Sequence, residues 1–177
     1  MLTIIKHHQQ AFTMLSLWRF LAIILTALAL TMTSAHVLEL PQKMQYDQHL
    51  YSAVNTSMYK YFATVGGFYC MGSIVASGVL TCLIRKRKSA FRWSVSGTLL
   101  LVLWFISWLT IVAPVNNQIA VALETAPETV PGLWMQVRER WEYGHAVGFG
   151  LQVVGFCAIV ISALVETRGR VGSERFG

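Results

Sequence analysis

Two long stretches of this chain contain no charged residue. One runs from Tyr61 to Ile84 over 24 residues, and the other runs from Trp93 to Val115 over 23 residues. Hydrocarbon offers no hydrogen-bond partners to the backbone, so a segment that crosses a bilayer folds as a helix or as a strand of a closed barrel. Apolar runs of about 20 residues have the length of a spanning helix, whereas barrel strands need only about 10. The two stretches therefore predict transmembrane helices.

Two further apolar runs lie nearer the ends of the sequence. Residues 14–38 form one, which Arg19 interrupts close enough to the helix end for its guanidinium to reach the lipid headgroups. This run is longer than the apolar core of a signal peptide, about 7–15 residues, so we expect a retained first helix. The charged fraction is 12%, against about 25% in soluble domains. We predict an all-α, integral membrane four-helix bundle with spans at 14–38, 61–84, 93–115 and 143–165.

The sequence divides into one transmembrane domain and two polar ends. We assign residues 1–13 to an N-terminal segment, residues 14–166 to the single four-helix domain and residues 167–177 to a tail. Ten Lys and Arg side chains lie in the two ends, at Arg19 and in the loop of residues 85–92, whereas four lie in the other two connections. Short, positively charged loops stay in the cytoplasm. The prediction is therefore that both termini are cytoplasmic and that the protein resides in a cell inner membrane.

The net charge of +6 does not indicate nucleic-acid binding, because the basic residues flank apolar runs. Positive side chains in those places set the topology and meet anionic lipid headgroups. The three cysteines, Cys70, Cys82 and Cys157, lie inside apolar runs without a CxxC pair. Such cysteines behave as small hydrophobic residues rather than as a thiol relay. The partner that the composition predicts is the lipid bilayer, with no nucleic acid.

The candidate site residues lie at two span ends on one side of the predicted membrane. His36 and Glu39 close the first span, and Glu142 and His145 open the fourth. A spacing of three residues puts both side chains of each pair on one face of a helix. Ionisable groups at membrane depth are candidates for function, and four-helix bundles build metal sites from Glu-x-x-His pairs on facing helices. The four residues are therefore predicted to meet in one cluster.

Three interpretations of this cluster stay open. In the first, the groups cap helix ends, pair with Arg138 or Arg140 and meet water, without any chemistry. In the second, they bind a metal ion, or the two histidines are axial ligands of a haem. In the third, no metal is present, and His36 or His145 is the acid–base group for a bound lipid-like substrate.

The same part of the sequence resembles a known family. A histidine and a carboxylate end the first span, Pro114 and Asn116 close the third, and Trp141-x3-His145 opens the fourth. In this layout residues 14–165 are similar to the anthrone-oxygenase-like family of small four-helix membrane proteins, most bacterial members of which have no assigned function. The segments typical of some bacterial members are Ala35-His36, Glu39-Leu40-Pro41 and Lys43. Members often carry an arginine three residues after the histidine, where this chain has Gly148. The resemblance implies a cofactor-independent oxygenase that acts on polycyclic anthrones.

The sharper functional hypothesis is an oxygenase or oxidoreductase at the outer face of the membrane. Its catalytic residues would be His36, His145, Glu39 and Glu142. Asn116 and Trp141 would donate hydrogen bonds to the oxygen of an apolar small molecule. This hypothesis expects no cofactor. In an alternative form of it, the same histidines and carboxylates hold a metal ion or a haem.

The competing hypothesis is a non-catalytic accessory or assembly subunit of a larger membrane complex, and the sequence leaves open whether the chain is an enzyme. Gly144 and Gly148 form a GxxxG pattern, and small residues surround Gly72. Faces of this kind let helices approach closely. In this hypothesis they would bind a membrane-protein partner or a second copy of the chain.

Overall fold

The computed structural model describes residues 2–59 and 61–174, and it describes the side chains of residues 13–59 and 61–165. Among these residues the chain is helical apart from short connections and contains no strand. The elements are α1 (Leu2–Lys43), α2 (Gln48–Ser57), α3 (Phe62–Leu83), α4 (Lys88–Ser107), the π-helix η1 (Trp108–Val112), α5 (Ala113–Thr125), the short 3₁₀ helix η2 (Pro127–Thr129) and α6 (Val130–Glu174).

Four segments of the described chain are long and apolar enough to cross a membrane. They are Thr13–Lys43, Phe62–Leu83, Lys88–Thr125 and Pro127–Val165. The predicted all-α class and the four long apolar helices are therefore confirmed. The backbone of residues 2–13 continues the first helix, since α1 begins at Leu2.

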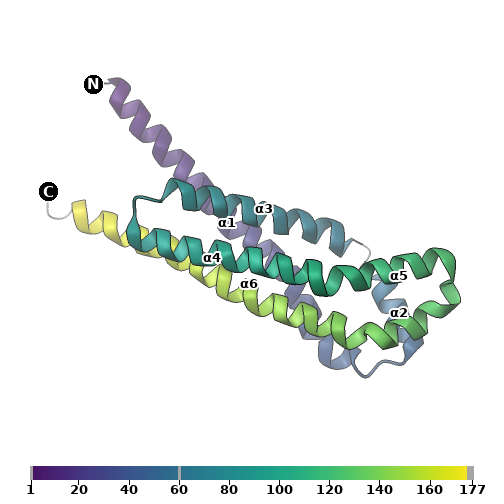
Figure 1. The fold of residues 1–177 in the computed structure, drawn as a ribbon. Helices are drawn as coiled ribbons and strands as arrows, with labels where there is room; N and C mark the ends of the chain where they lie inside the picture. The colour runs from purple at the N-terminus through teal and green to yellow at the C-terminus, as the bar shows by residue number, and fades with distance from the viewer. Residues whose placement is uncertain (1, 60, 175–177) are drawn as a thin grey trace.

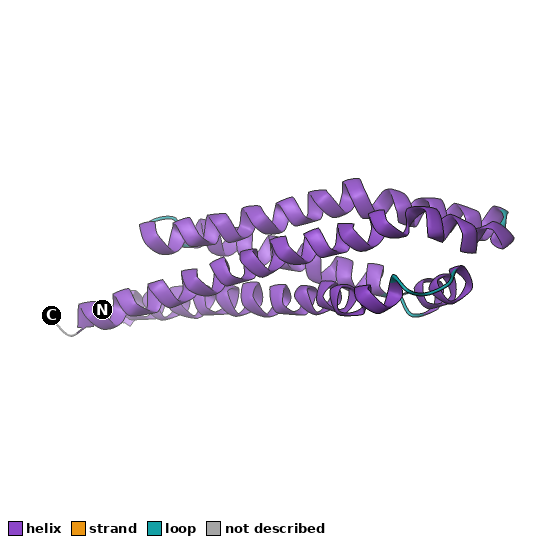
Figure 2. Ribbon diagram, turned by 90° about the horizontal axis from the view of Figure 1, so that it is seen from below, coloured by secondary structure: helices purple, strands orange, loops and turns teal. Residues whose placement is uncertain are grey.

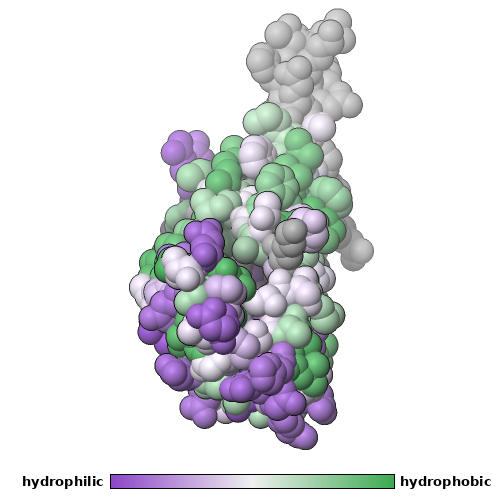
Figure 3. Space-filling model, turned by 90° about the vertical axis from the view of Figure 1, so that its right-hand side faces the viewer, coloured by the Kyte–Doolittle hydropathy of each residue, from purple (hydrophilic) through white to green (hydrophobic). Residues whose placement is uncertain are grey.

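The four long helices lie side by side in one elongated bundle (Figures 1 and 2). Because α1 and α4 each contact both α3 and α6, the order around the bundle is α3, α1, α6, α4. Both chain ends and the α3–α4 connection, which holds Arg85–Arg87, lie at one end, here called the basic end. The other end consists of α2, α5 and the start of α6, and we call it the cap. Seen from the cap, hydrophilic side chains gather on this end of the molecule (Figure 3).

The helix of the third span continues beyond residue 115, the predicted end of the span. The helix passes through the π-turn η1 and continues as α5 to Thr125, so the segment from Lys88 covers 38 residues. Proline lacks the N–H that would bond the carbonyl four residues earlier, here that of Thr110. Arg140 on α6 fills this gap, because its Nη2 donates to the Thr110 oxygen at 3.2 Å. A neighbouring helix thus supplies a donor to the carbonyl that proline leaves open, and the helix continues past the predicted end of the span.

The cap is a helical extension of the bundle with its own core. At about 1.5 Å per residue, the 38 residues from Lys88 span about 57 Å, well beyond the hydrocarbon core of about 30 Å. The segment between the third and fourth predicted spans is therefore two helix extensions. Pro127 and Pro131 lie where these extensions join, in first turns that tolerate proline. The buried core of the cap comprises Tyr51, Tyr59, Val112, Val115, Ile119, Ala122, Val130, Trp134 and Trp141.

The glycines of α6 bring it close to α4 inside the same chain. A Cβ on Gly144 would lie 2.8 Å from the Ile111 side chain, and one on Gly148 would lie 2.8 Å from that of Trp104. A Cβ on Gly72 would meet Leu25 at 3.2 Å. The small-residue faces predicted for a membrane partner are therefore covered, at these glycines, by the chain's own helices.

Candidate functional site

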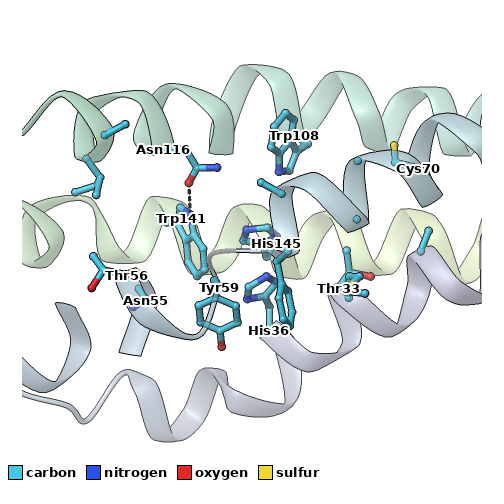
Figure 4. Close-up of a pocket in the computed structure, with 18 of the residues that line it drawn as sticks. Thr33, His36, Asn55, Thr56, Tyr59, Cys70, Trp108, Asn116, Trp141 and His145 are labelled. Atoms are coloured by element: carbon cyan, nitrogen blue, oxygen red, sulfur yellow. Dashed lines mark hydrogen bonds between the residues drawn. The ribbon is translucent and has the colours of Figure 1, made fainter. Parts of the chain in front are cut away.

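The two predicted histidines meet between α1 and α6. The rings of His36 and His145 are stacked, with their centroids 4.0 Å apart and their planes at 25°. Both side chains are buried, and His36 Nδ1 has no hydrogen-bond partner among the described residues. These two residues are called the histidine pair below, and Figure 4 shows them at the centre of a pocket.

Aromatic rings surround the histidine pair. The ring of Trp141 stands edge-on to both imidazoles, with centroid distances of 4.9 Å to His36 and 4.5 Å to His145. Tyr59 lies 4.5 Å from His36 and Phe62 lies 5.4 Å from it. Edge-to-face contacts at such distances fix ring orientation. The histidine pair is therefore held in a defined geometry, away from water.

Asn116 positions Trp141. The indole Nε1 of Trp141 donates to Asn116 Oδ1 at 2.8 Å. This contact is possible because the helix continues past Pro114 and carries Asn116 alongside α6. With its oxygen engaged, Asn116 offers its amide N–H groups as donors toward the cavity that it lines. Asn116 and Trp141, both predicted site residues, thus lie beside the histidine pair.

Glu142 does not line the cavity, because other groups hold its carboxylate. Its Oε1 lies 2.6 Å from Lys43 Nζ and accepts from the Tyr51 hydroxyl at 2.7 Å. Both side chains of the ion pair are at most 2% exposed, and Tyr51 is fully buried. Burial, and then the neighbouring Glu142, raise the pKa of Tyr51, so this phenol stays a proton donor.

Lys43 connects this buried charge to the aromatic residues of the site. Its Nζ lies 4.5 Å from the centre of the Trp141 ring, 4.7 Å from that of Tyr59 and 5.5 Å from that of Tyr51. Ring faces attract cations, most strongly where water is excluded. The Lys43 ammonium therefore contacts the rings of Trp141 and Tyr59, and the same two rings contact His36.

Glu39 lies outside this arrangement. Its side chain is partly exposed, and it is not among the residues that line the cavity. Of the four residues predicted to cluster, the structure brings together His36 and His145, ties Glu142 to Lys43, and leaves Glu39 at the edge of α1. Glu39 shares a helical face with His36 but does not enter the cavity wall. Among the described side chains of this helix, the charged residue that is buried is Lys43, two turns beyond His36.

A cavity of about 380 Å³ runs past the histidine pair. Its volume is in the range of small-molecule sites, about 300–1,000 Å³. No Asp, Glu, Lys or Arg is among the described residues that line it. It is exposed to the surroundings between α3 and α5, where the lining residues Ala63, Ala120 and Leu123 are exposed. The cavity therefore suits an uncharged, largely apolar molecule.

The arrangement of the described donors does not match a metal or haem site. Among residues 13–59 and 61–165, no three His, Cys, Asp or Glu side chains lie together so that they could hold a metal ion. Imidazole lone pairs lie in the ring plane, so two stacked rings do not direct them at one ion between them. Axial haem ligands stand on opposite sides of the iron, whereas the rings of His36 and His145 are 4.0 Å apart.

Sequence reasoning missed several residues of this region. Lys43 was not among the predicted site residues, although it follows His36 by seven residues and therefore lies on the same helical face. Tyr51 and Asn55 are four apart on the buried face of α2, a spacing that marks an inward face. Trp134 lies before the predicted fourth span, in the first turns of α6, which begins at Val130.

No protein-family model, no curated protein and no solved structure matches the chain. The resemblance to the anthrone-oxygenase-like family therefore stays a prediction. Of its residues, Asn116, Trp141 and His145 form one contact group. Gly148, which replaces an arginine common in the family, has no room for a longer side chain because Trp104 covers it.

Proposed function

We propose that the protein is a small multi-pass membrane oxidoreductase of the oxygenase type, in which the histidine pair acts as the acid–base group. The observation that carries the proposal is the contact of two buried imidazoles on the wall of an uncharged cavity that is exposed between α3 and α5. Buried ionisable groups at membrane depth are costly and are kept where they serve a function. The substrate would be an uncharged, apolar molecule taken from the bilayer.

The proposed orientation places the cap on the outer face of a cell inner membrane and both termini in the cytoplasm. Its support is the distribution of positive charge, ten Lys and Arg side chains against four, because basic loops are retained in the cytoplasm. The α3–α4 connection with Arg85, Lys86 and Arg87 lies at the same end of the bundle as both chain ends. The histidine pair would then lie near the outer interface.

The proposed reaction replaces the two hydrogen atoms of an acidic CH₂ group with one oxygen atom of O₂. One imidazole removes a proton from a CH₂ group that a neighbouring carbonyl acidifies, and the resulting carbanion reduces O₂ and forms a C–O bond. The imidazolium returns the proton to the peroxide. Removal of the second C–H proton then breaks the O–O bond, so that CH₂ and O₂ give C=O and water. The amide N–H groups of Asn116 would donate to the carbonyl oxygen while it carries negative charge.

A neutral imidazole can accept a proton at its free ring nitrogen, and general-base catalysis contributes about 100- to 10,000-fold to a proton transfer. His36 offers Nδ1, which no described residue engages. Glu142 would act indirectly, since it holds Lys43 and Tyr51 rather than the cavity wall. Glu39 has no contact with substrate in this scheme.

The test is oxygen consumption by the protein in lipid nanodiscs with anthrone as the C–H acid. His36→Gln and His145→Gln should each lower the rate about 100-fold or more, because glutamine keeps polarity without basicity. His49→Gln is the matched control, since His49 is exposed on the cap and should keep the wild-type rate. Equal rates in wild type and both pair variants, or no acceleration over empty nanodiscs, would overturn the proposal.

A further inference from the structure

The cap end of the cavity carries two buried polar atoms that the proposed reaction does not use. Asn55 Oδ1 and Trp134 Nε1 have no hydrogen-bond partner within the described part of the chain. Asn55 is 6% exposed and Trp134 is 3% exposed, and both line the cavity. A buried polar atom without a partner costs about 1–3 kcal/mol. Two of them on one cavity therefore point to a missing polar ligand group.

Both side chains are fixed in place by Tyr51. The Asn55 amide Nδ2 donates to the Tyr51 backbone oxygen at 2.8 Å, which leaves Oδ1 as its open atom. The ring of Trp134 stands edge-on to Tyr51 and to Trp141, at 5.6 Å from each. Tyr51 in turn is tied to Glu142. The two open atoms therefore belong to side chains that are held in place, and the part of the cavity wall that carries them is here called the cap subsite.

The chemistry of the cap subsite selects a hydroxyl group. Asn55 Oδ1 accepts a hydrogen bond and Trp134 Nε1 donates one. A hydroxyl both donates and accepts, so it is the simplest uncharged group whose hydrogen-bonding capacity matches either atom. A carboxylate or phosphate could not donate to Asn55, and an ammonium could not accept from Trp134. No charged side chain of the described lining offsets a charge on the ligand.

The polarity of the cavity changes along its length. Figure 4 shows Asn55 and Thr56 at one end, the histidine pair in the middle, and Thr33 and Cys70 toward the other end. The far end is lined mainly by small or apolar residues of α1, α3 and α4, namely Ala29, Met32, Gly66, Gly67, Cys70, Trp104 and Phe105. A Cβ on Gly67 would meet nothing within 4 Å, so space is open there for a chain.

We propose that the cap subsite binds the hydroxyl head of a neutral, single-chain amphiphile that carries its carbonyl-activated CH₂ group at the histidine pair and continues as an apolar chain toward Cys70. This names the substrate class for the proposed oxygenase and rests on it for what happens at the histidine pair. The amphiphile lies with its head at the cap and its tail among the spans, as a lipid lies in the leaflet on the cap side. It enters between α3 and α5, where Ala63 and Ala120 are exposed.

Binding of two matched probes tests the cap subsite without any turnover. Dodecan-1-ol can donate to Asn55 and accept from Trp134, whereas methyl undecyl ether, of the same length, can only accept. Apparent affinities are measured by native mass spectrometry of protein taken from nanodiscs that contain each probe. The wild-type protein should bind the alcohol about tenfold more tightly than the ether, as expected for one hydrogen bond to an otherwise unpaired buried group. Equal binding would overturn the inference, and this measurement needs no variant.

Two substitutions separate the two hydrogen bonds. Asn55→Leu should reduce alcohol binding to the level of the ether, while ether binding stays unchanged. Trp134→Phe should weaken alcohol and ether together, by about tenfold. Asn117→Leu and Trp93→Phe are the matched controls, because both residues are exposed and neither lines the cavity. An alcohol preference that survives Asn55→Leu would overturn the inference.

The outcome is distinguishable from that of the proposed reaction. His145→Gln should keep the preference for the alcohol, since the histidine does not contact the head group. If the preference holds while the histidine variants consume oxygen as the wild type does, the cap subsite stands and the oxygenase proposal falls. If the histidine variants lose activity while the preference is absent, the reverse applies.

Discussion

The two halves of the bundle differ in how closely their helices pack. Toward the basic end, α4 and α6 approach until a Cβ on Gly97 would lie 2.7 Å from the Ile159 side chain. Polar side chains there bond one another or the backbone, as when the Thr81 hydroxyl lies 2.7 Å from that of Ser94 and Ser162 donates to the Ala90 oxygen. Toward the cap, large aromatic side chains hold the helices apart around a cavity of about 380 Å³.

The difference shows which half departs from close helix packing and which groups are buried in that half. Close approach of helices through small residues is the main source of stability between spans, because lipid tails are as apolar as the helices. The cap half gives up part of this contact and buries an ion pair and a histidine pair instead. The basic half is therefore a scaffold, and the cap half bears the candidate site.

The buried ion pair gives the largest expected effect on this contrast. Glu142→Leu leaves Lys43 charged and unpaired within the cap, which should lower the free energy of unfolding by about 3–5 kcal/mol. Replacing both residues, with Lys43→Met added, should recover most of this loss, because no buried charge remains. Equilibrium unfolding in mixed detergent micelles measures both variants. A double variant as unstable as the single one would show that the pair acts through shape and not through charge.

A methyl group in the scaffold should have the next largest effect. Gly97→Ala forces a Cβ against Ile159 and to 2.9 Å from the Gly155 carbonyl oxygen. Overpacking of this kind costs about 1–3 kcal/mol. Gly78→Ala is the control, since a Cβ there meets nothing within 4 Å, and it should stabilise the helix by up to about 1 kcal/mol. The same unfolding assay measures the stability of both variants. Equal stability of the two would contradict close contact between α4 and α6.

The smallest effect is expected for a single hydrogen bond in the cap. Asn116→Leu removes the acceptor of Trp141 Nε1 and should cost about 1 kcal/mol. Because the indole then loses its fixed orientation, tryptophan fluorescence should change together with stability. Asn117→Leu, one residue away and exposed, should change neither. If the Asn116→Leu variant keeps the stability and the fluorescence of the wild type, Asn116 does not position Trp141.

The spans were predictable because their physics is local. Length and lack of charge identified the helices around residues 61–84 and 93–115, and helical spacing placed His36 and His145 at facing ends. The cavity brings both histidines together with Asn116 and Trp141, all four of which were candidates from the sequence.

The parts that were missed depend on contacts between distant segments. Proline and asparagine at 114–117 are typical of turns, and nothing local reveals that the helix continues through them while Arg140 donates to the Thr110 carbonyl. Glu142 pairs with Lys43 across 99 positions of sequence, so the sequence offered Glu39 as an equally good member of the site. Which carboxylate turns inward is decided by tertiary contacts alone.

The widened turn at Trp108–Val112 has the effect of a one-residue insertion in a continuous helix. Each residue advances an α-helix by about 100°, so everything from Ala113 onward points about 100° away from where an unbroken α-helix would place it. Deleting one residue there would restore a plain α-helix and leave Asn116 facing Trp141 and Gly97 against Ile159, because the widened turn takes up the extra residue. In evolutionary terms, the turn absorbs a change of one residue in length, so the helix can gain or lose a residue there while the cap and the scaffold both keep their contacts.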